Sequence, residues 1–258
     1  MTTFDELEAA LMQITDSAPD GSVFLENSRE REKNYSRSSI CRWLEIVRIL
    51  EKHAPVDRCL DIGTSPFTFV LKRWCRAVET LDFTEAFRTR CEQTGVRLHI
   101  GGEAWPETLL PNENYDCIIF LEVIEHMHMN PEKILLFLKR KLRAGGLLIM
   151  STPNMMALGN RLRMLLNRKL THFHYPPFSD NEHAIHGHLH DRVFMPAEMK
   201  EYFQNTKWSS FSLGYHGVAV SDGVQGYSMA GRLARAPIQI IKHLVPSTRQ
   251  LMLIVAKK

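Results

Sequence analysis

The sequence lacks the features that would place it within a membrane or on a nucleic acid. No apolar run approaches the roughly 20 residues that a membrane-spanning helix needs. The first residues lack the basic-then-apolar pattern of a secretory signal. The formal net charge of +3 is too small to indicate nucleic-acid binding, although a local basic patch fits the composition. We therefore expect a cytoplasmic protein that does not act on nucleic acid.

Cysteine is scarce as well. The five cysteines are an odd number, and no two of them form a C-x-x-C pair. Cys59 and Cys117 lie beside apolar residues in candidate strands, where a free cysteine behaves as a small hydrophobic side chain. We expect reduced thiols in the core rather than disulfides or a metal knuckle.

What the sequence does contain is an alternation of short apolar segments and amphipathic helices. Helical spacing is present over residues 4–14 and about 37–53, with a polar stretch between them that we expect to be a loop. Further helices are predicted at 66–75, 84–95, 131–146 and 196–206. Strands are predicted at 58–63, 77–83, 96–102, 115–123, 147–154, 208–215 and 251–258.

This order predicts an α/β fold with a doubly wound, mostly parallel seven-stranded sheet. Strands that alternate with helices of this length indicate βαβ units. The unbroken CIIFL run within residues 115–123 indicates a strand that is buried on both faces.

Acids and a glycine follow the first three predicted strands. In an open α/β sheet, ligands bind at the carboxyl ends of the strands. Asp61 and Gly63 end the first strand, and a glycine there lets the backbone approach a ligand closely. Asp82 ends the second strand and could accept two ribose hydroxyl groups, while Glu103 follows the third and could meet an adenine amino group. Each residue alone is an ordinary turn or cap residue, but together they indicate a nucleoside site.

Three segments resemble the class I S-adenosylmethionine-dependent methyltransferases. Residues 61–67 read DIGTSPF and resemble the family's D-x-G-x-G-x-G pattern, with Ser65 and Phe67 in place of the later glycines. Residues 115–154 look like the block from the fourth to the fifth strand, including E-V-x-E-H and S-T-P-N. Residues 188–203 are similar to the H-x-R-x-F-T-x-x-E-L segment, with Met195 in place of Thr. The resemblance covers about residues 58–214 and is nearest to the ubiquinone-biosynthesis O-methyltransferase-like group.

The resemblance implies a Rossmann-like methyltransferase fold and S-adenosylmethionine as the cofactor. It implies a methyltransferase domain over residues 56–258, after an N-terminal helical extension over 1–55. The implied contacts are Asp61, Gly63, Thr64 and Ser65 at the methionine part, Asp82 at the ribose, Phe83, Glu103 and Ala104 at the adenine, and Leu121 beside the cofactor. A nicotinamide enzyme would usually show G-x-G-x-x-G after the first strand, which residues 63–69 do not match.

Candidate catalytic residues follow the fourth strand and the insertion. A general base helps when the methyl acceptor is a hydroxyl group, and the candidates are Glu122, Glu125, His126 and His190. If the chain turns helical after the fourth strand, Glu122 and His126 are four residues apart and face one side.

The same four residues carry a second hypothesis. In small-RNA 2′-O-methyltransferases, a similar E-V-I-E-H with a later histidine binds a divalent metal, which here would be held by Glu122, Glu125, His126 and His190. The two motifs also occur in related enzymes without a known metal, so we do not favour a metal here.

Residues 155–190 are predicted to be an insertion. Its first part, 155–170, is a basic amphipathic helix, which we expect to pack its apolar face on the core. The alternatives are a lid over the acceptor, or a surface that lies on an anionic membrane together with residues 232–245.

A histidine-rich loop completes the insertion. In an extended segment His186, His188 and His190 would share a face and could line the acceptor pocket. We expect His172, His174 and His183 to be surface residues.

The predicted function is S-adenosylmethionine-dependent O-methylation of a small or lipophilic metabolite, because candidate bases cluster near the acceptor site. One alternative is a metal-assisted RNA ribose 2′-O-methyltransferase. Another is a non-catalytic S-adenosylmethionine-binding or scaffold protein, which the altered glycine loop favours. The sequence fixes neither the acceptor nor the oligomeric state.

Overall fold

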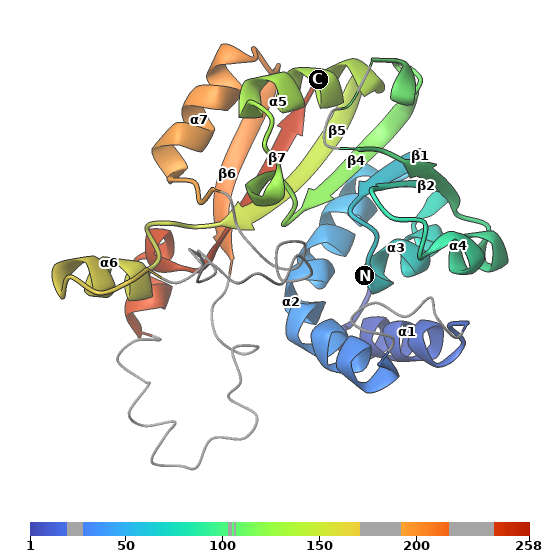
Figure 1. The fold of residues 1–258 in the computed structure, drawn as a ribbon, viewed down its shortest axis with the longest axis horizontal. Helices are drawn as coiled ribbons and strands as arrows, with labels where there is room; N and C mark the ends of the chain where they lie inside the picture. The colour runs from blue at the N-terminus through green and yellow to red at the C-terminus, as the bar shows by residue number, and fades with distance from the viewer. Residues whose placement is uncertain (20–27, 103–104, 106, 171–191, 217–239) are drawn as a thin grey trace, which may run out of the picture.

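A single sheet of seven strands organises the molecule (Figure 1). The computed structural model describes residues 1–19, 28–102, 105, 107–170, 192–216 and 240–258. The strands are β1 (Val56–Ile62), β2 (Cys75–Asp82), β3 (Arg97–Ile100), β4 (Tyr115–Leu121), β5 (Leu142–Pro153), β6 (Ser210–His216) and β7 (Leu251–Lys257). They lie in the order β3-β2-β1-β4-β5-β7-β6, and β7 runs antiparallel to both of its neighbours while the other pairs are parallel. The predicted mostly parallel seven-stranded sheet is confirmed.

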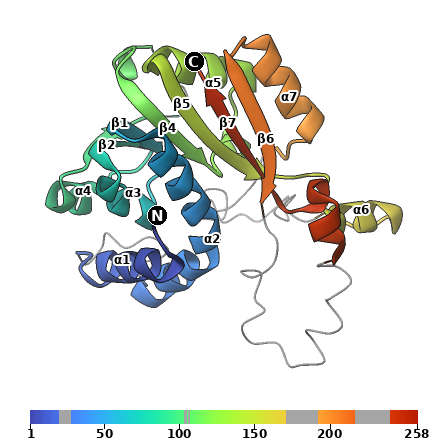
Figure 2. The same ribbon diagram turned by 180° about the vertical axis from the view of Figure 1, so that it is seen from behind.

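Helices cover both faces of this sheet, as Figure 2 also shows from behind. Successive side chains of a strand point to opposite faces. In β4, Cys117 and Ile119 therefore lie in one core cluster, while Ile118 and Phe120 lie in the other. The first cluster includes side chains of α1 (Phe4–Asp16), α2 (Arg29–His53), α3 (Pro66–Val70) and α4 (Arg88–Thr94). The second includes those of α5 (Pro131–Lys141) and α7 (Pro196–Asn205). The sheet is doubly wound, as predicted.

Helix α2 begins eight residues before the predicted start at residue 37, so the expected loop is wrong over residues 29–36. Ser28 caps the helix by accepting a hydrogen bond from the backbone N–H of Arg31. Polar composition hides this first part of the helix because its buried face carries Glu32 rather than an apolar residue. Both carboxylate oxygens of Glu32 accept bonds from Arg90 on α4, at 3.1 and 2.9 Å, and both side chains are at most 1% exposed.

The predicted helix over 131–146 ends at Lys141, and residues 142–146 belong to β5. Leu142 is buried and extended, which ends the helix. Tyr115 pairs with Leu142 and Cys117 with Leu147, so the intervening residues of β5 bulge from the ladder. Gly145 makes this bulge at φ +74°, a conformation that glycine adopts readily.

Helix α6 (Leu158–Leu165) does not pack its apolar face on the core, contrary to the expectation for residues 155–170. Asn160 is its buried residue, whereas the exposed fractions of Leu162 and Leu165 are 46% and 82%. Figures 1 and 2 both show α6 beside the short helix of residues 240–244. Residues 232–239 lie outside the described part of the chain.

The expected reduced thiols are confirmed: all five cysteines are free, and all but Cys41 are buried. Within the residues that the structure describes, no helix is both long and apolar enough to cross a bilayer.

Candidate functional site

The carboxyl ends of β1 and β2 bring two of the predicted acids together. Asp61 and Asp82 are 3% and 7% exposed. Thr68 on α3 donates a hydrogen bond of 2.5 Å to Asp61 Oδ2. Burial raises the pKa of Asp61 to about 7, and the negative charge of Asp82 adds to this effect. The carboxyl group of Asp61 is thus about half protonated at neutral pH.

Gly63 follows β1 in a conformation that few other residues adopt. Its φ is +85°, and a Cβ atom at this position would lie 2.7 Å from Cγ2 of Val123. Its N–H donates to the carbonyl oxygen of Leu81 at 3.0 Å, which extends the contact between β1 and β2. The backbone of Gly63 therefore lies close to the loop after β4, which leaves no room for a side chain here.

The carboxylate of Asp82 holds the loops that surround it. Its Oδ2 accepts the backbone N–H of Thr64 at 2.8 Å, and its Oδ1 accepts those of Phe83 and Thr84 at 2.8 and 3.2 Å. An ionised carboxylate offers about four acceptor positions, so these bonds leave room for a further one. Beside it, the ring of Phe83 is 80% exposed.

The loop after β4 differs from the helical turn that the sequence predicted. Only residues Ile124–His126 form a single 3-10 turn, and Glu122 precedes it at φ +54°. Glu122 and His126 are therefore not related as positions four apart on an α-helix. Ser151 on β5 donates to Oε1 of Glu122 at 2.7 Å, whereas the side chain of His126 is exposed.

Glu125 is a buried acid on this loop. It is fully buried, and Thr152 on β5 donates to its Oε2 at 3.0 Å. Its Oε1 has no hydrogen-bond partner among the described residues. Burial, together with the negative charge of Glu122, raises the pKa of Glu125 well above its usual value. The direction of this shift favours the protonated form of Glu125.

Arg42 is a residue of this site that the sequence analysis missed. It lies on α2, and its Nη1 is 3.6 Å from Oε2 of Glu122, with 13% and 23% of the two side chains exposed. Its Nη2 donates to Ser39, while its buried Nε has no partner within the described structure. Its neighbours one turn away on α2 include Ser39 and Glu45, so no local pattern in the sequence marks Arg42.

The S-T-P-N sequence at the end of β5 has a structural role at its last residue. Asn154 is buried, and its Nδ2 donates to the carbonyl oxygens of Ser247 and Arg249 at 2.9 and 2.8 Å. Its Oδ1 accepts the N–H of Met156 at 2.9 Å. This side chain therefore joins the end of β5 to the segment that precedes β7.

The remaining predicted residues are placed as follows. Ser65 precedes α3, and its N–H donates to Oγ1 of Thr68 at 2.9 Å. Leu121 ends β4, half-buried against the first core cluster. Outside the described residues lie Glu103, Ala104, His172, His174, His183, His186, His188 and His190.

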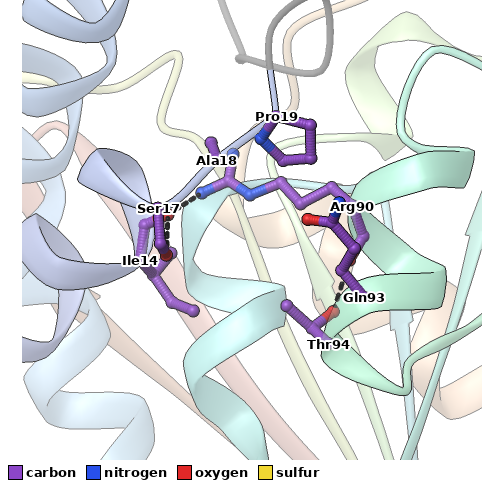
Figure 3. Close-up of a pocket in the computed structure, with 7 residues that line it drawn as sticks. All are labelled: Ile14, Ser17, Ala18, Pro19, Arg90, Gln93 and Thr94. Atoms are coloured by element: carbon purple, nitrogen blue, oxygen red, sulfur yellow. Dashed lines mark hydrogen bonds between the residues drawn. The ribbon is translucent and has the colours of Figure 1, made fainter.

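Neither a metal cluster nor a large hollow marks the site in the described structure. No group of three His, Cys, Asp or Glu residues that could hold a metal occurs in the described ranges. A hollow of about 180 Å³ lies elsewhere, between α1 and α4, where the side chain of Arg90 reaches toward Ile14 (Figure 3). Another of about 310 Å³ is lined by Thr2, Glu6, Arg73 and Trp74.

Taken together, the strand order and the flanking helices define an open α/β protein, in which the carboxyl edge of the sheet is the candidate ligand site. A family model described as a methyltransferase domain matches residues 29–208. No curated protein sequence matches the chain significantly.

Solved structures agree with this match. A SAM-dependent methyltransferase from Archaeoglobus fulgidus is 17% identical, with a TM-score of 0.56 over 84% of this chain and 93% of that one. A SAM-dependent methyltransferase from Thermotoga maritima, described as a possible histamine N-methyltransferase, is 15% identical, with a TM-score of 0.57 over 89% and 95% of the two chains. Phosphoethanolamine N-methyltransferase 2 from Haemonchus contortus, in complex with S-adenosyl-L-methionine, is 11% identical, with a TM-score of 0.54 over 100% of this chain and 60% of that one.

At such identities the likeness shows the fold, and the family model supplies the relationship. The chain belongs to the methyltransferase domain family, within the class I S-adenosylmethionine-dependent methyltransferase superfamily, and is a methyltransferase. The resemblance predicted from the sequence is confirmed.

Proposed function

We propose that the protein transfers the methyl group of S-adenosylmethionine to an oxygen atom of a small or lipophilic acceptor. In this reaction the acceptor oxygen forms a bond to the methyl carbon, the bond from that carbon to sulfur breaks, and the hydroxyl proton leaves. The observation that supports an oxygen acceptor is the pair of acids after β4, of which Glu122 is ion-paired and partly exposed while Glu125 is buried.

The cofactor would lie across the carboxyl ends of β1, β2 and β4. Asp61, Gly63, Thr64 and Ser65 would surround its methionine part, because Gly63 lets the backbone come close and Asp61 offers a partly ionised carboxylate to its ammonium group. Asp82 has an acceptor position left for a ribose hydroxyl group. The exposed ring of Phe83 offers a flat surface to the adenine. Leu121 would lie beside the cofactor, and Glu103 with Ala104 would complete the adenine pocket.

Glu122 is the group that we assign as the proton acceptor. Ser151 fixes its Oε1, while its Oε2 lies on the side of Arg42. Because the side chain of Glu122 is 23% exposed, its carboxylate can accept a hydrogen bond from the hydroxyl group and then its proton. Glu125 is less suited to this role because its side chain is fully buried and burial raises its pKa. The exposed His126 is an alternative base, as is His190, which lies outside the described residues.

The test compares two matched variants, Glu122→Gln and Glu125→Gln. Purified protein is first titrated with S-adenosylmethionine and S-adenosylhomocysteine by calorimetry, where we expect micromolar binding for both. The transfer of labelled methyl groups is then measured with a catechol and a long-chain alkylphenol. We expect Glu122→Gln to lower kcat about 100-fold or more with little change in cofactor affinity, and Glu125→Gln to change kcat far less.

Nitrogen acceptors form the second arm, since two of the similar structures carry N-methyltransferase names. Anilines with the same ring substituents as the phenols are offered alongside them. Methylation of the amines alone would overturn the oxygen assignment. An absence of cofactor binding at millimolar concentrations would overturn the enzyme assignment and support the scaffold alternative.

A further inference from the structure

An exposed apolar surface with a basic border lies at the end of the molecule where α6 follows β5. We call it the α6 face and define it by exposed side chains of α6 and of residues 240–245. Leu165, Leu166 and Leu244 are 82%, 65% and 72% exposed. The other apolar members, between 41% and 58% exposed, are Leu162, Met164, Ile240, Ile241 and Val245. Isolated exposed leucines are ordinary, but eight apolar side chains on two neighbouring helices form a patch of the kind that marks an interaction site.

Hydrogen bonds fix the two halves of this face to each other. Arg161 on α6 donates from Nη2 to the carbonyl oxygen and the hydroxyl group of Ser247, at 3.3 and 3.2 Å. Arg249 donates from Nε to the carbonyl oxygen of Lys242 at 3.1 Å. Asn154 also binds Ser247, so the end of β5 holds the same segment. The face is therefore a built part of the fold.

The charged residues of the two described segments that carry the α6 face are all basic or histidine. Residues 155–170 and 240–250 contain neither Asp nor Glu. Arg163, Arg168 and Lys169 are exposed within or directly after α6. Apolar side chains bordered by cations alone match an anionic bilayer surface, where leucines enter the acyl region and basic groups meet lipid phosphates.

We propose that the α6 face docks the protein on an anionic lipid bilayer. A second copy of the chain fits this face less well, because two such faces in contact would bring their cations together. The α6 face lies at the carboxyl end of β5, the same sheet edge as the candidate site. A docked protein would therefore receive a lipophilic acceptor from the bilayer, and this extension rests on the proposed function.

The experiment is sedimentation of the full chain with vesicles of phosphatidylcholine alone and of phosphatidylcholine with 30% phosphatidylglycerol. Leu165→Asp combined with Leu244→Asp should lower the partition coefficient for anionic vesicles at least tenfold. Arg168→Glu combined with Lys169→Glu should lower it by a similar factor. Neither measurement involves cofactor or acceptor, so failure here is distinct from failure of the proposed function.

Matched controls carry the same substitutions elsewhere on the surface. Leu136→Asp replaces a leucine on α5 that is 39% exposed, and Lys133→Glu with Lys200→Glu reverses two exposed charges on α5 and α7. These controls should bind vesicles like the unchanged chain. Circular dichroism checks that every variant folds.

Three results would overturn the proposal. The first is a lack of binding to anionic vesicles by the unchanged chain, and the second is equal binding to neutral and anionic vesicles. The third is a dimer in sedimentation velocity that Leu165→Asp disperses, which would assign the α6 face to a second copy of the chain.

Discussion

The buried carboxyl group of Asp61 should make the stability of the protein fall as the pH rises from 4 to 7. Its pKa is 3.8 ordinarily and about 7 in the folded protein. A group whose folded pKa is raised contributes stability that is present below the unfolded pKa and is lost as the pH rises through the folded pKa. The complete effect corresponds to about 4 kcal/mol.

The perturbation that isolates this effect is Asp61→Asn, a neutral side chain of the same shape that can still accept the hydrogen bond from Thr68. Between pH 5 and 7.5 we expect the free energy of unfolding of the unchanged chain to fall by about 3 kcal/mol more than that of the variant. Urea unfolding followed by tryptophan fluorescence at several pH values measures this difference. Asp57→Asn, at the exposed start of the same strand, is the matched control.

Parallel pH profiles for the unchanged chain and Asp61→Asn would refute the reasoning. A second readout links the group to the cofactor. If the cofactor's ammonium group lies beside Asp61, binding at pH 6 should release close to one proton, because the cation favours the ionised carboxylate. Calorimetric titration in buffers of different ionisation enthalpy counts this proton, and Asp61→Asn should release none.

Three further substitutions test particular contacts. Gly63→Ala should destabilise the protein by about 1–3 kcal/mol and weaken cofactor binding, because the added carbon meets Val123 at 2.7 Å and φ is +85°. Glu32→Ala should lower the free energy of unfolding by about 3–5 kcal/mol in urea titrations, since it leaves the buried cation of Arg90 unpaired. Asn154→Ala should cost about 1–3 kcal/mol and speed hydrogen exchange in residues 246–250, because the partly buried carbonyl groups of Ser247 and Arg249 lose its amide donor.

Each of these three has an exposed counterpart as its control. Gly159→Ala on α6 meets nothing within 4 Å, and Glu30→Gln and Gln204→Ala alter exposed positions on α2 and α7. Their unfolding free energies should stay within about 0.5 kcal/mol of the unchanged chain. A test substitution that behaved like its control would contradict the contact assigned to it.

The sheet was predictable because its signals are local. The CIIFL run of β4 indicates a buried strand. The acid or glycine after β1 and β2 indicates where each strand ends, and each signal spans only a few residues. The features that the sequence did not predict depend on contacts between residues that are far apart in the chain. Arg42 reaches Glu122 only because α2 packs near the end of β4, and the start of α2 was hidden because Glu32 is buried through a partner on α4.

The loop after β4 illustrates a second limit. Spacing alone suggested that Glu122 and His126 share a helix face, but the left-handed conformation of Glu122 redirects the chain before any helix begins. Composition carries little information about the backbone angles of one non-glycine residue. The charge state of Glu125 was equally beyond the sequence, because it depends on the burial that β5 and the loop create together.

Helix α2 contacts both the core of the protein and the proposed reaction site. The ring of Trp43 stacks on Phe67 of α3 with centroids 5.3 Å apart, and one position earlier in the chain Arg42 meets the acid beside the proposed acceptor. A protein shortened to begin at β1 would lose both the core packing that Trp43 provides and the guanidinium group of Arg42 beside Glu122, the proposed base. A shortened version of this protein should therefore retain α2. We expect α2 and the sheet to unfold together in one cooperative transition.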